Sequence, residues 1–383
     1  MTKKLIVILA MAQLTLPIAA QAVPAPTVSG LFNGSPWTAT SLVVGTTSTA
    51  TVAGGGNPIY QAPKPQYNGV VSLIMDEGAA GKFICSGTLL SDRQSILTAG
   101  HCVSSGAGTA NPISTTAYFN NGSADTQAFL DPTSIAITVK YYHVNPLYTG
   151  EVIDQNDIAV LRLSAPAPAF ATSYSLYTAG DLTGLDYNIA GYGARSDTGG
   201  SDGTTPPHGL GVGRLRQGDN RYDFRYGDAA FGGFFDGKPV GGFFGKADNT
   251  YTYIADFDNG LAANDASCKL AGAFGLGGSQ FCNLGRGATE VSTAGGDSGG
   301  PQFVDGKIAS ITSFGQSYGM RFGDIDTSLN SSFGELNGFV PTFIHAAFIG
   351  SVIPEPASWM MMIAGFGLVG VIARRARRTV VAA

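Results

Sequence analysis

The chain alternates short apolar runs with turns, and this pattern limits its fold more than any other feature. Glycine makes up 54 of the 383 residues, about twice the usual share, which favours turns over long helices. Short runs at this spacing predict the strands of an all-β barrel or sandwich. The best helical candidate covers residues 342–349, and the clearest strand runs cover residues 70–75, 95–98, 135–142, 158–163, 188–190 and 307–312.

The first 22 residues have the order of a secretory signal peptide. Lys3 and Lys4 precede an apolar stretch at residues 5–12, and small residues close the segment at Ala20 and Ala22. This order predicts export and cleavage after Ala22, with a buried core helix as the alternative.

The C-terminal end carries an uncharged stretch of 17 residues, 357–373, at the lower limit for crossing a bilayer. Four arginines follow it directly, so the positive-inside rule leaves the tail in the cytoplasm and the body outside. The sequence therefore predicts a transmembrane helix at residues 357–373.

Just before this stretch stands the sequence Pro354-Glu355-Pro356. Together with the apolar helix and the arginines, it resembles the PEP-CTERM sorting signal of Gram-negative bacteria over residues 352–378. The resemblance implies recognition by a membrane exosortase, transient anchoring in the inner membrane, removal of the tail, and a periplasmic, surface or extracellular body. A permanent single-span anchor is the alternative.

The charge balance argues against a nucleic-acid partner. The two ends hold six of the 22 basic residues and one of the 27 acidic residues, so the body has a net charge of −10. A surface of this sign repels phosphate backbones. We expect membrane contact from the tail and not from the body.

Four cysteines in an exported chain predict two disulfides. Three pairings are possible, and the short loops favour Cys85–Cys102 and Cys268–Cys282. A zinc site is the alternative, but the spacings contain no C-x-x-C pair, so we expect no metal and no organic cofactor.

The body divides into a leader and one domain. Residues 23–66 are rich in Pro, Gly, Thr, Ala and Ser with almost no charge, which predicts a flexible leader or pro-segment. Residues 67–350 form the main domain, with a Gly- and Phe-rich hairpin insertion at about 195–264. A separate domain is the alternative for this insertion, but its sparse aliphatic content argues against a second core. The sorting signal occupies residues 351–383.

Residues 296–301 read Gly-Asp-Ser-Gly-Gly-Pro and centre on Ser298. A serine hydroxyl becomes a nucleophile when a base takes its proton and backbone amides receive the oxyanion. Glycines beside Ser298 allow a tight turn in which the amides of Gly296 and Ser298 converge. His101 follows an apolar strand, and Asp157 stands at the start of a buried strand where its carboxylate needs a hydrogen-bond donor.

In the order His101, Asp157, Ser298, these motifs resemble the trypsin/chymotrypsin family of serine endopeptidases over residues 67–349. The resemblance implies two antiparallel six-stranded β-barrels with the three residues in the cleft between them. Ser298 is then the nucleophile, His101 the general base and Asp157 the group that orients the imidazole. The resemblance further implies that Ser313 bonds the aspartate from behind and that residues 313–315, Ser313, Phe314 and Gly315, pair with a protein or peptide substrate.

The sequence also departs from the family pattern. The primary pocket position is Ser292, which is uncharged and argues against cleavage after Lys or Arg. Asp324 or Asp326 lies in a segment that can fold near this pocket, so the sequence leaves the cleavage specificity open. Family activation frees an apolar terminus that pairs with the aspartate before the serine, here Asp297, and the nearest match, at residues 43–46, lies about fifteen residues too early. Alternative functions are a catalytically silent surface or matrix adhesion protein and an esterase.

Two further features receive plain interpretations. His143, His208 and His345 lack a motif, and we expect them at the surface or at strand ends. The sequence from Asp256 to Gly260 hints at a calcium loop, but several expected ligand positions are missing. We therefore expect a solvated turn there.

Overall fold

The computed structural model describes residues 21–22, 27–40, 44–45, 57–63, 65–106, 109, 111–122, 125–236, 242–278 and 280–353. Residues 1–20, Pro354-Glu355-Pro356 and the expected helix at 357–373 lie outside the described residues. Among the described residues, no helix has the length and apolar character that crossing a bilayer requires.

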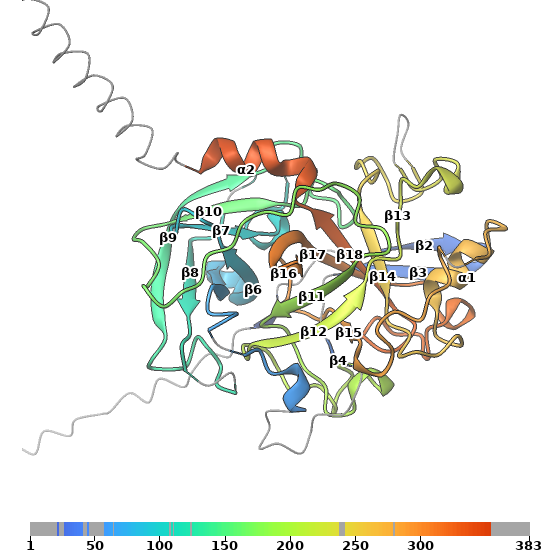
Figure 1. The fold of residues 1–383 in the computed structure, drawn as a ribbon, viewed down its shortest axis with the longest axis horizontal. Helices are drawn as coiled ribbons and strands as arrows, with labels where there is room; N and C mark the ends of the chain where they lie inside the picture. Colours follow the sequence, from blue (N-terminus) through green and yellow to red (C-terminus); the bar gives the residue numbers. More distant parts are fainter. Residues whose placement is uncertain are drawn as a thin grey trace, which may run out of the picture.

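The first half of the domain is a closed six-stranded barrel (Figure 1). Strands pair in the order β6-β5-β8-β9-β10-β7, and pairing of β6 with β7 closes the ring. The side chains of β5, β6, β7 and β10 are mostly buried, whereas β9 exposes several of its own. The two-residue strand β1 (Gln21–Ala22) joins β6 from outside in parallel. The barrel strands are β5 (Val70–Asp76), β6 (Lys82–Leu89), β7 (Ser95–Thr98), β8 (Ser114–Phe119), β9 (Ile135–Val144) and β10 (Ala159–Leu163).

The second half is a curled sheet in the order β12-β11-β16-β17-β18-β14-β13. Its two edge strands are contiguous in the chain. Tyr222 donates its backbone N–H to Leu185, and Asp223 donates its own to Ile254. These bonds extend the β11–β12 and β13–β14 ladders to the two residues that link the edge strands, and the sheet forms a half-barrel. The strands are β11 (Asp186–Gly191), β12 (Arg216–Arg221), β13 (Phe224–Arg225), β14 (Tyr253–Asp256), β16 (Pro301–Val304), β17 (Lys307–Ser317) and β18 (Leu336–Pro341).

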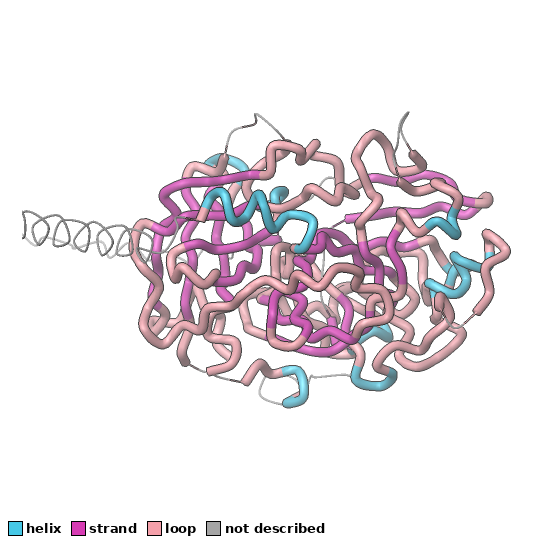
Figure 2. The backbone as a smooth tube through the Cα atoms, turned by 45° about the horizontal axis from the view of Figure 1, so that its top comes forward, coloured by secondary structure: helices cyan, strands magenta, loops and turns pink. Residues whose placement is uncertain are grey.

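This arrangement confirms the predicted all-β, trypsin-like fold. Of the two expected six-stranded barrels, the first is closed, whereas the second is a half-barrel. Figure 2 shows that helices are short and lie outside the strands. The helical candidate near residue 345 is confirmed as a 3-10 turn that leads into α2. The α-helices are α1 (Ala266–Gly272) and α2 (Ala346–Val352), and the 3-10 turns are η1 (Pro58–Tyr60), η2 (Gly78–Ala80), η3 (Gly100–Cys102), η4 (Gly199–Ser201), η5 (Ala229–Phe231), η6 (Gly287–Thr289), η7 (Met320–Phe322) and η8 (Phe343–His345).

The leader differs from the expected flexible segment. Its described part forms a hairpin of β2 (Val28–Phe32) and β3 (Ser35–Thr40), which lies against the second half of the domain (Figure 1). Strand β3 pairs with β17, and β4 (Val44–Gly45) pairs with β15 (Val291–Ser292). Phe32 and Trp37 are each only 4% exposed, so burial of aromatic surface holds this hairpin on the body.

The expected insertion at 195–264 is narrower in the structure. Strands β12, β13 and β14 belong to the second sheet itself. The long connections in this region are residues 192–215 between β11 and β12 and residues 226–252 between β13 and β14. The hairpin proper is β13–β14, joined by residues 226–252. Phe231, Phe235 and Phe244 of this connection are buried in one aromatic cluster with Phe32 and Trp37 of the leader. The phenylalanines thus fix the hairpin and the leader to each other.

Candidate active site

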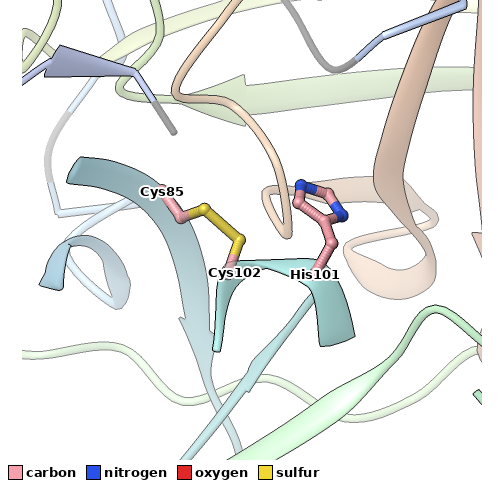
Figure 3. Close-up of side chains that lie close together, drawn as sticks. All are labelled: Cys85, His101 and Cys102. Atoms are coloured by element: carbon pink, nitrogen blue, oxygen red, sulfur yellow. A yellow bond between two sulfur atoms is a disulfide. The ribbon is translucent and has the colours of Figure 1, made fainter. Parts of the chain in front are cut away.

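His101 is held at the end of β7 by the turn η3, where the chain leaves the barrel. Its neighbour Cys102 is disulfide-bonded to Cys85 on β6, as the loop lengths predicted (Figure 3). The second predicted bond, Cys268–Cys282, is also present. Because Cys85 and Cys102 are oxidised together, they are not thiolate ligands beside His101. Their bond fixes the turn that carries the imidazole.

Asp157 orients that imidazole. One carboxylate oxygen, Oδ1, accepts the backbone N–H of His101 at 2.7 Å, and Oδ2 lies 2.7 Å from His101 Nδ1. Ser313 donates its hydroxyl to the same Oδ2 at 2.6 Å, as the family resemblance implied. A carboxylate facing Nδ1 keeps the proton on that nitrogen, so in the neutral ring Nε2 carries the lone pair. The chain thus brings His101, Asp157 and Ser313 together.

The second ring nitrogen of His101, Nε2, is available in this arrangement. His101 Nε2 is buried and has no hydrogen-bond partner among the described residues. The Ser298 hydroxyl is therefore not hydrogen-bonded to it. Ser298 lies at the same junction, since its carbonyl accepts the backbone N–H of Ser86 at 2.8 Å. Ser86 directly follows Cys85, whose disulfide partner adjoins His101. Catalytic hydrogen bonds are often long in the absence of substrate and tighten when it binds.

The turn around Ser298 leaves two amides unused. Those of Asp297, Gly299 and Gly300 donate to Ala294, Thr312 and Asp297, respectively. Those of Gly296 and Ser298 donate to no residue that the structure describes. A pair of amides without internal acceptors, beside a candidate nucleophile, has the arrangement that an oxyanion requires.

Two contacts hold this turn against the first barrel. Ser86 donates its hydroxyl to the Gly296 carbonyl at 2.9 Å and accepts the Tyr192 N–H at 2.9 Å. Gly299 has φ +74°, and a Cβ there would lie 2.1 Å from Thr98 Oγ1 and 2.5 Å from the Ala99 nitrogen. Glycine is therefore required at 299 by both conformation and space.

Asp297 is buried behind the turn. Its Oδ1 accepts the Gly193 N–H at 2.8 Å, and its Oδ2 has no partner among the described residues. Burial raises the pKa of this carboxyl well above its ordinary value. A Cβ at Gly191 or Gly193 would lie 1.9 Å from a carboxylate oxygen, so both glycines make room for it.

The expected substrate-binding residues occupy different settings. Ser292 donates its hydroxyl to Asn337 Oδ1 at 3.0 Å. Phe314 is fully buried and packs on Gly338, so only its backbone can meet a peptide. Gly315 pairs with Thr40 of the leader, which places β3 along the edge where a substrate strand was expected.

Some residues of the site carried no signal in the sequence. The sequence pattern assigns no role to Ser86 or to Asn337, which also accepts the Thr293 N–H and hydroxyl, each at 2.7 Å. Only the fold shows that Ser86 hydrogen-bonds the turn that carries Ser298 and that Asn337 hydrogen-bonds Ser292, the expected wall of the primary pocket (the Ser292 wall).

Two predictions were wrong: the exposed or strand-end position of His345 and the solvated turn from Asp256 to Gly260. His345 is buried, at 5% exposure, and contacts the Gln155 carbonyl and Asn145, just behind the Asp157 loop. Burial lowers the pKa of His345, so its ring is held neutral. The turn at Asp256 and Asp258 is not solvated, because these residues are 1% and 0% exposed beneath α1 and the segment before β15.

The family comparisons agree with this geometry. Residues 42–209 match the Trypsin family, a span that includes His101 and Asp157 and stops before Ser298. Residues 352–378 match the PEP-CTERM protein-sorting motif, as the sequence predicted. No curated protein matches the chain.

Proposed function

From the chain's place in the trypsin family, with a PEP-CTERM sorting motif at its end, we propose that this protein is an exported serine endopeptidase. It hydrolyses peptide bonds of protein or peptide substrates through an acyl-enzyme intermediate. The family match supports the class of reaction, and His101, Asp157 and Ser298 carry out its steps.

Ser298 attacks the scissile carbonyl while His101 Nε2 takes its hydroxyl proton. The amides of Gly296 and Ser298 receive the negative charge that forms on the carbonyl oxygen. Asp157 stabilises the protonated imidazole, which then gives its proton to the leaving amine. A water molecule repeats these steps on the acyl-enzyme and releases Ser298.

One observation carries the proposal. Asp157 Oδ2 lies 2.7 Å from His101 Nδ1 and favours a proton on that nitrogen, while Nε2 has no hydrogen-bond partner among the described residues. A histidine buried for packing alone would be expected to use both nitrogens, since buried polar atoms are normally hydrogen-bonded. The unused amides at Gly296 and Ser298 support the same role for the adjoining turn.

The pocket wall at Ser292 points to specificity. The Ser292 side chain carries no charge, and its hydroxyl donates to Asn337 Oδ1. An uncharged wall favours apolar residues before the scissile bond over Lys or Arg.

The leader acts as a pro-segment. Its strand β3 pairs with residues 315–317 of β17, the edge on which a substrate backbone would add as a strand. While β3 stays there, a peptide cannot use the same hydrogen-bonding groups, so the full-length chain is latent.

The two chain ends direct export. The PEP-CTERM motif indicates a secreted protein of a Gram-negative bacterium that an exosortase processes. The first 22 residues serve as signal peptide, and residues 357–373 hold the chain in the inner membrane until the tail is removed.

Peptide hydrolysis by matched serine variants tests the proposal. The protein freed of its leader should cleave peptides with apolar residues before the scissile bond, and Ser298→Ala should abolish cleavage. Ser114→Ala, at the exposed start of β8, is the control and should retain full activity. Equal cleavage by the Ser298→Ala protein would refute the assignment.

A further inference from the structure

Five carboxylates are buried together beside the first turn of α1. They come from separate parts of the chain: the β12–β13 junction, the end of β14, the turn after it, the start of α1 and the segment before β15. None is more than 3% exposed. The group consists of Asp223, Asp256, Asp258, Asp265 and Glu290.

Three of them are close enough to share one ion. One oxygen each of Asp256, Asp258 and Asp265 lies within 4.8 Å of the other two. Calcium binds oxygens at about 2.3–2.6 Å, so two ligands on opposite sides of the ion are about 5 Å apart. The observed spacing therefore fits a single calcium ion between them.

Backbone amides hold these side chains in place. Asp256 Oδ2 accepts the Ser267 N–H at 3.0 Å, Asp258 Oδ1 the Gly260 N–H at 2.7 Å, and Asp265 Oδ1 the Cys268 N–H at 2.7 Å. In each carboxylate, one oxygen thus accepts a backbone N–H that positions the side chain, and the second oxygen can bind an ion.

An unsatisfied atom points to a ligand. Asp258 is fully buried, yet its Oδ2 has no hydrogen-bond partner among the described residues. A buried polar atom without a partner is costly unless an ion or another group satisfies it.

The charge of the cluster points the same way. No Lys, Arg or His side chain of the described residues forms a salt bridge with Asp223, Asp256, Asp258 or Asp265. Carboxylates that form no ion pair are rarely buried, because removing their charges from water is costly. A divalent cation offsets that cost.

We propose that Asp256, Asp258 and Asp265 bind a calcium ion that braces the second sheet. Hard carboxylate oxygens select calcium, magnesium or manganese over zinc and copper. Magnesium dehydrates reluctantly and keeps several waters, whereas calcium accepts a buried cage of protein oxygens.

The ion ties the specificity wall to α1. Glu290 accepts the backbone N–H groups of Asp258 at 3.0 Å and Asn259 at 3.2 Å, and it directly precedes Val291 and Ser292. Holding Asp258 therefore also holds the chain that leads into the Ser292 wall. The ion takes no part in the chemical steps of the proposed peptide hydrolysis, so its binding can be measured separately from that activity.

Calcium binding to the secreted protein tests the proposal without an activity readout. After treatment with EGTA, titration calorimetry should detect one calcium site, and calcium should raise the thermal midpoint by about 5 °C. Magnesium at the same concentration should give a much smaller shift. No binding at 10 mM calcium, or an equal response to magnesium, would overturn the proposal.

Matched variants locate the ion. Asp258→Asn should weaken calcium binding by about tenfold or more, since it removes one charged ligand and keeps the Oδ1 contact. Asp305→Asn, in the exposed turn before β17, should bind as the wild type does. If Asp258→Asn does not fold, Asp265→Asn replaces it, because asparagine also caps a helix. Unchanged calcium affinity in a folded variant would refute the assigned site.

Discussion

Thr40 of the leader and Gly315 of β17 are paired residues of one antiparallel ladder. The next pairs are Ala39 with Gln316 and Thr38 with Ser317. This relationship gives the leader a physical role, because the same edge of β17 would receive the backbone of a peptide substrate. Competition between strand and substrate should therefore control access to Ser298.

Weakening the β3 ladder should increase activity. Ala39→Pro removes a backbone donor from β3 and disturbs its pairing. Loss of about 1 kcal/mol of pairing corresponds to a roughly fivefold gain in peptide hydrolysis by the full-length protein. The gain should vanish when Ser298→Ala is added. If Ala39→Pro folds and leaves the rate unchanged, β3 does not limit substrate access.

Asp157→Asn should preserve the fold and remove most of the activity. The amide can donate to Nδ1 and favour the opposite tautomer, in which Nε2 carries the proton and cannot act as a base. We expect kcat to fall by about 10³–10⁴ with KM little changed. A loss below tenfold in steady-state kinetics would contradict the orienting role.

Gly299→Ala and Gly306→Ala form a matched pair of substitutions. Both glycines have positive φ, +74° and +71°, so both variants carry the same conformational cost of about 1 kcal/mol. Only at 299 does the added Cβ meet Thr98 and Ala99, whereas nothing lies within 4 Å at 306. Urea unfolding should show Gly299→Ala less stable than Gly306→Ala by at least about 1–2 kcal/mol. Equal losses would contradict the close packing of the Ser298 turn.

The Asp297 carboxyl should make the stability of the uncleaved chain depend on pH. Burial raises the pKa of Asp297 in the folded state, so the folded chain binds this proton more tightly than the unfolded chain. Its contribution is full below the unfolded pKa and is lost as pH rises through the folded pKa.

Asp297→Asn removes that proton and keeps an acceptor for the Gly193 N–H. Relative to the variant, the wild type should lose at least about 1 kcal/mol of unfolding free energy between pH 4 and pH 8. Urea unfolding across this range gives both curves, and parallel curves would show that Asp297 does not cause the loss.

Much of the domain could be predicted from local patterns. Strands such as β5 and β7 can be predicted from β-branched apolar runs between turns, and they lie within a few residues of the expected bounds. Asp157 could be paired with His101 because a buried carboxylate at a strand start needs a donor. Short loops between cysteines favoured the two observed disulfides.

The rest depends on contacts that no local pattern carries. Strand β3 is fixed by backbone bonds to β17 and by aromatic packing with residues more than 190 positions away, so its composition alone indicated a loose leader. The turn after Asp256 has the residues of a solvated loop, and contacts with distant segments, among them α1 and Glu290, bury it. Asn337 became part of the Ser292 wall because β18 pairs with β17 beside it.

Labelling with a fluorophosphonate probe tests the central claim most directly, because the probe reacts only with a serine that a neighbouring base activates. After removal of the leader, mass spectrometry of the labelled protein should find the adduct on the peptide that contains Ser298. His101→Ala should remove the labelling. A protein that is folded and free of its leader but takes up no label, or carries it on another serine, would contradict the account.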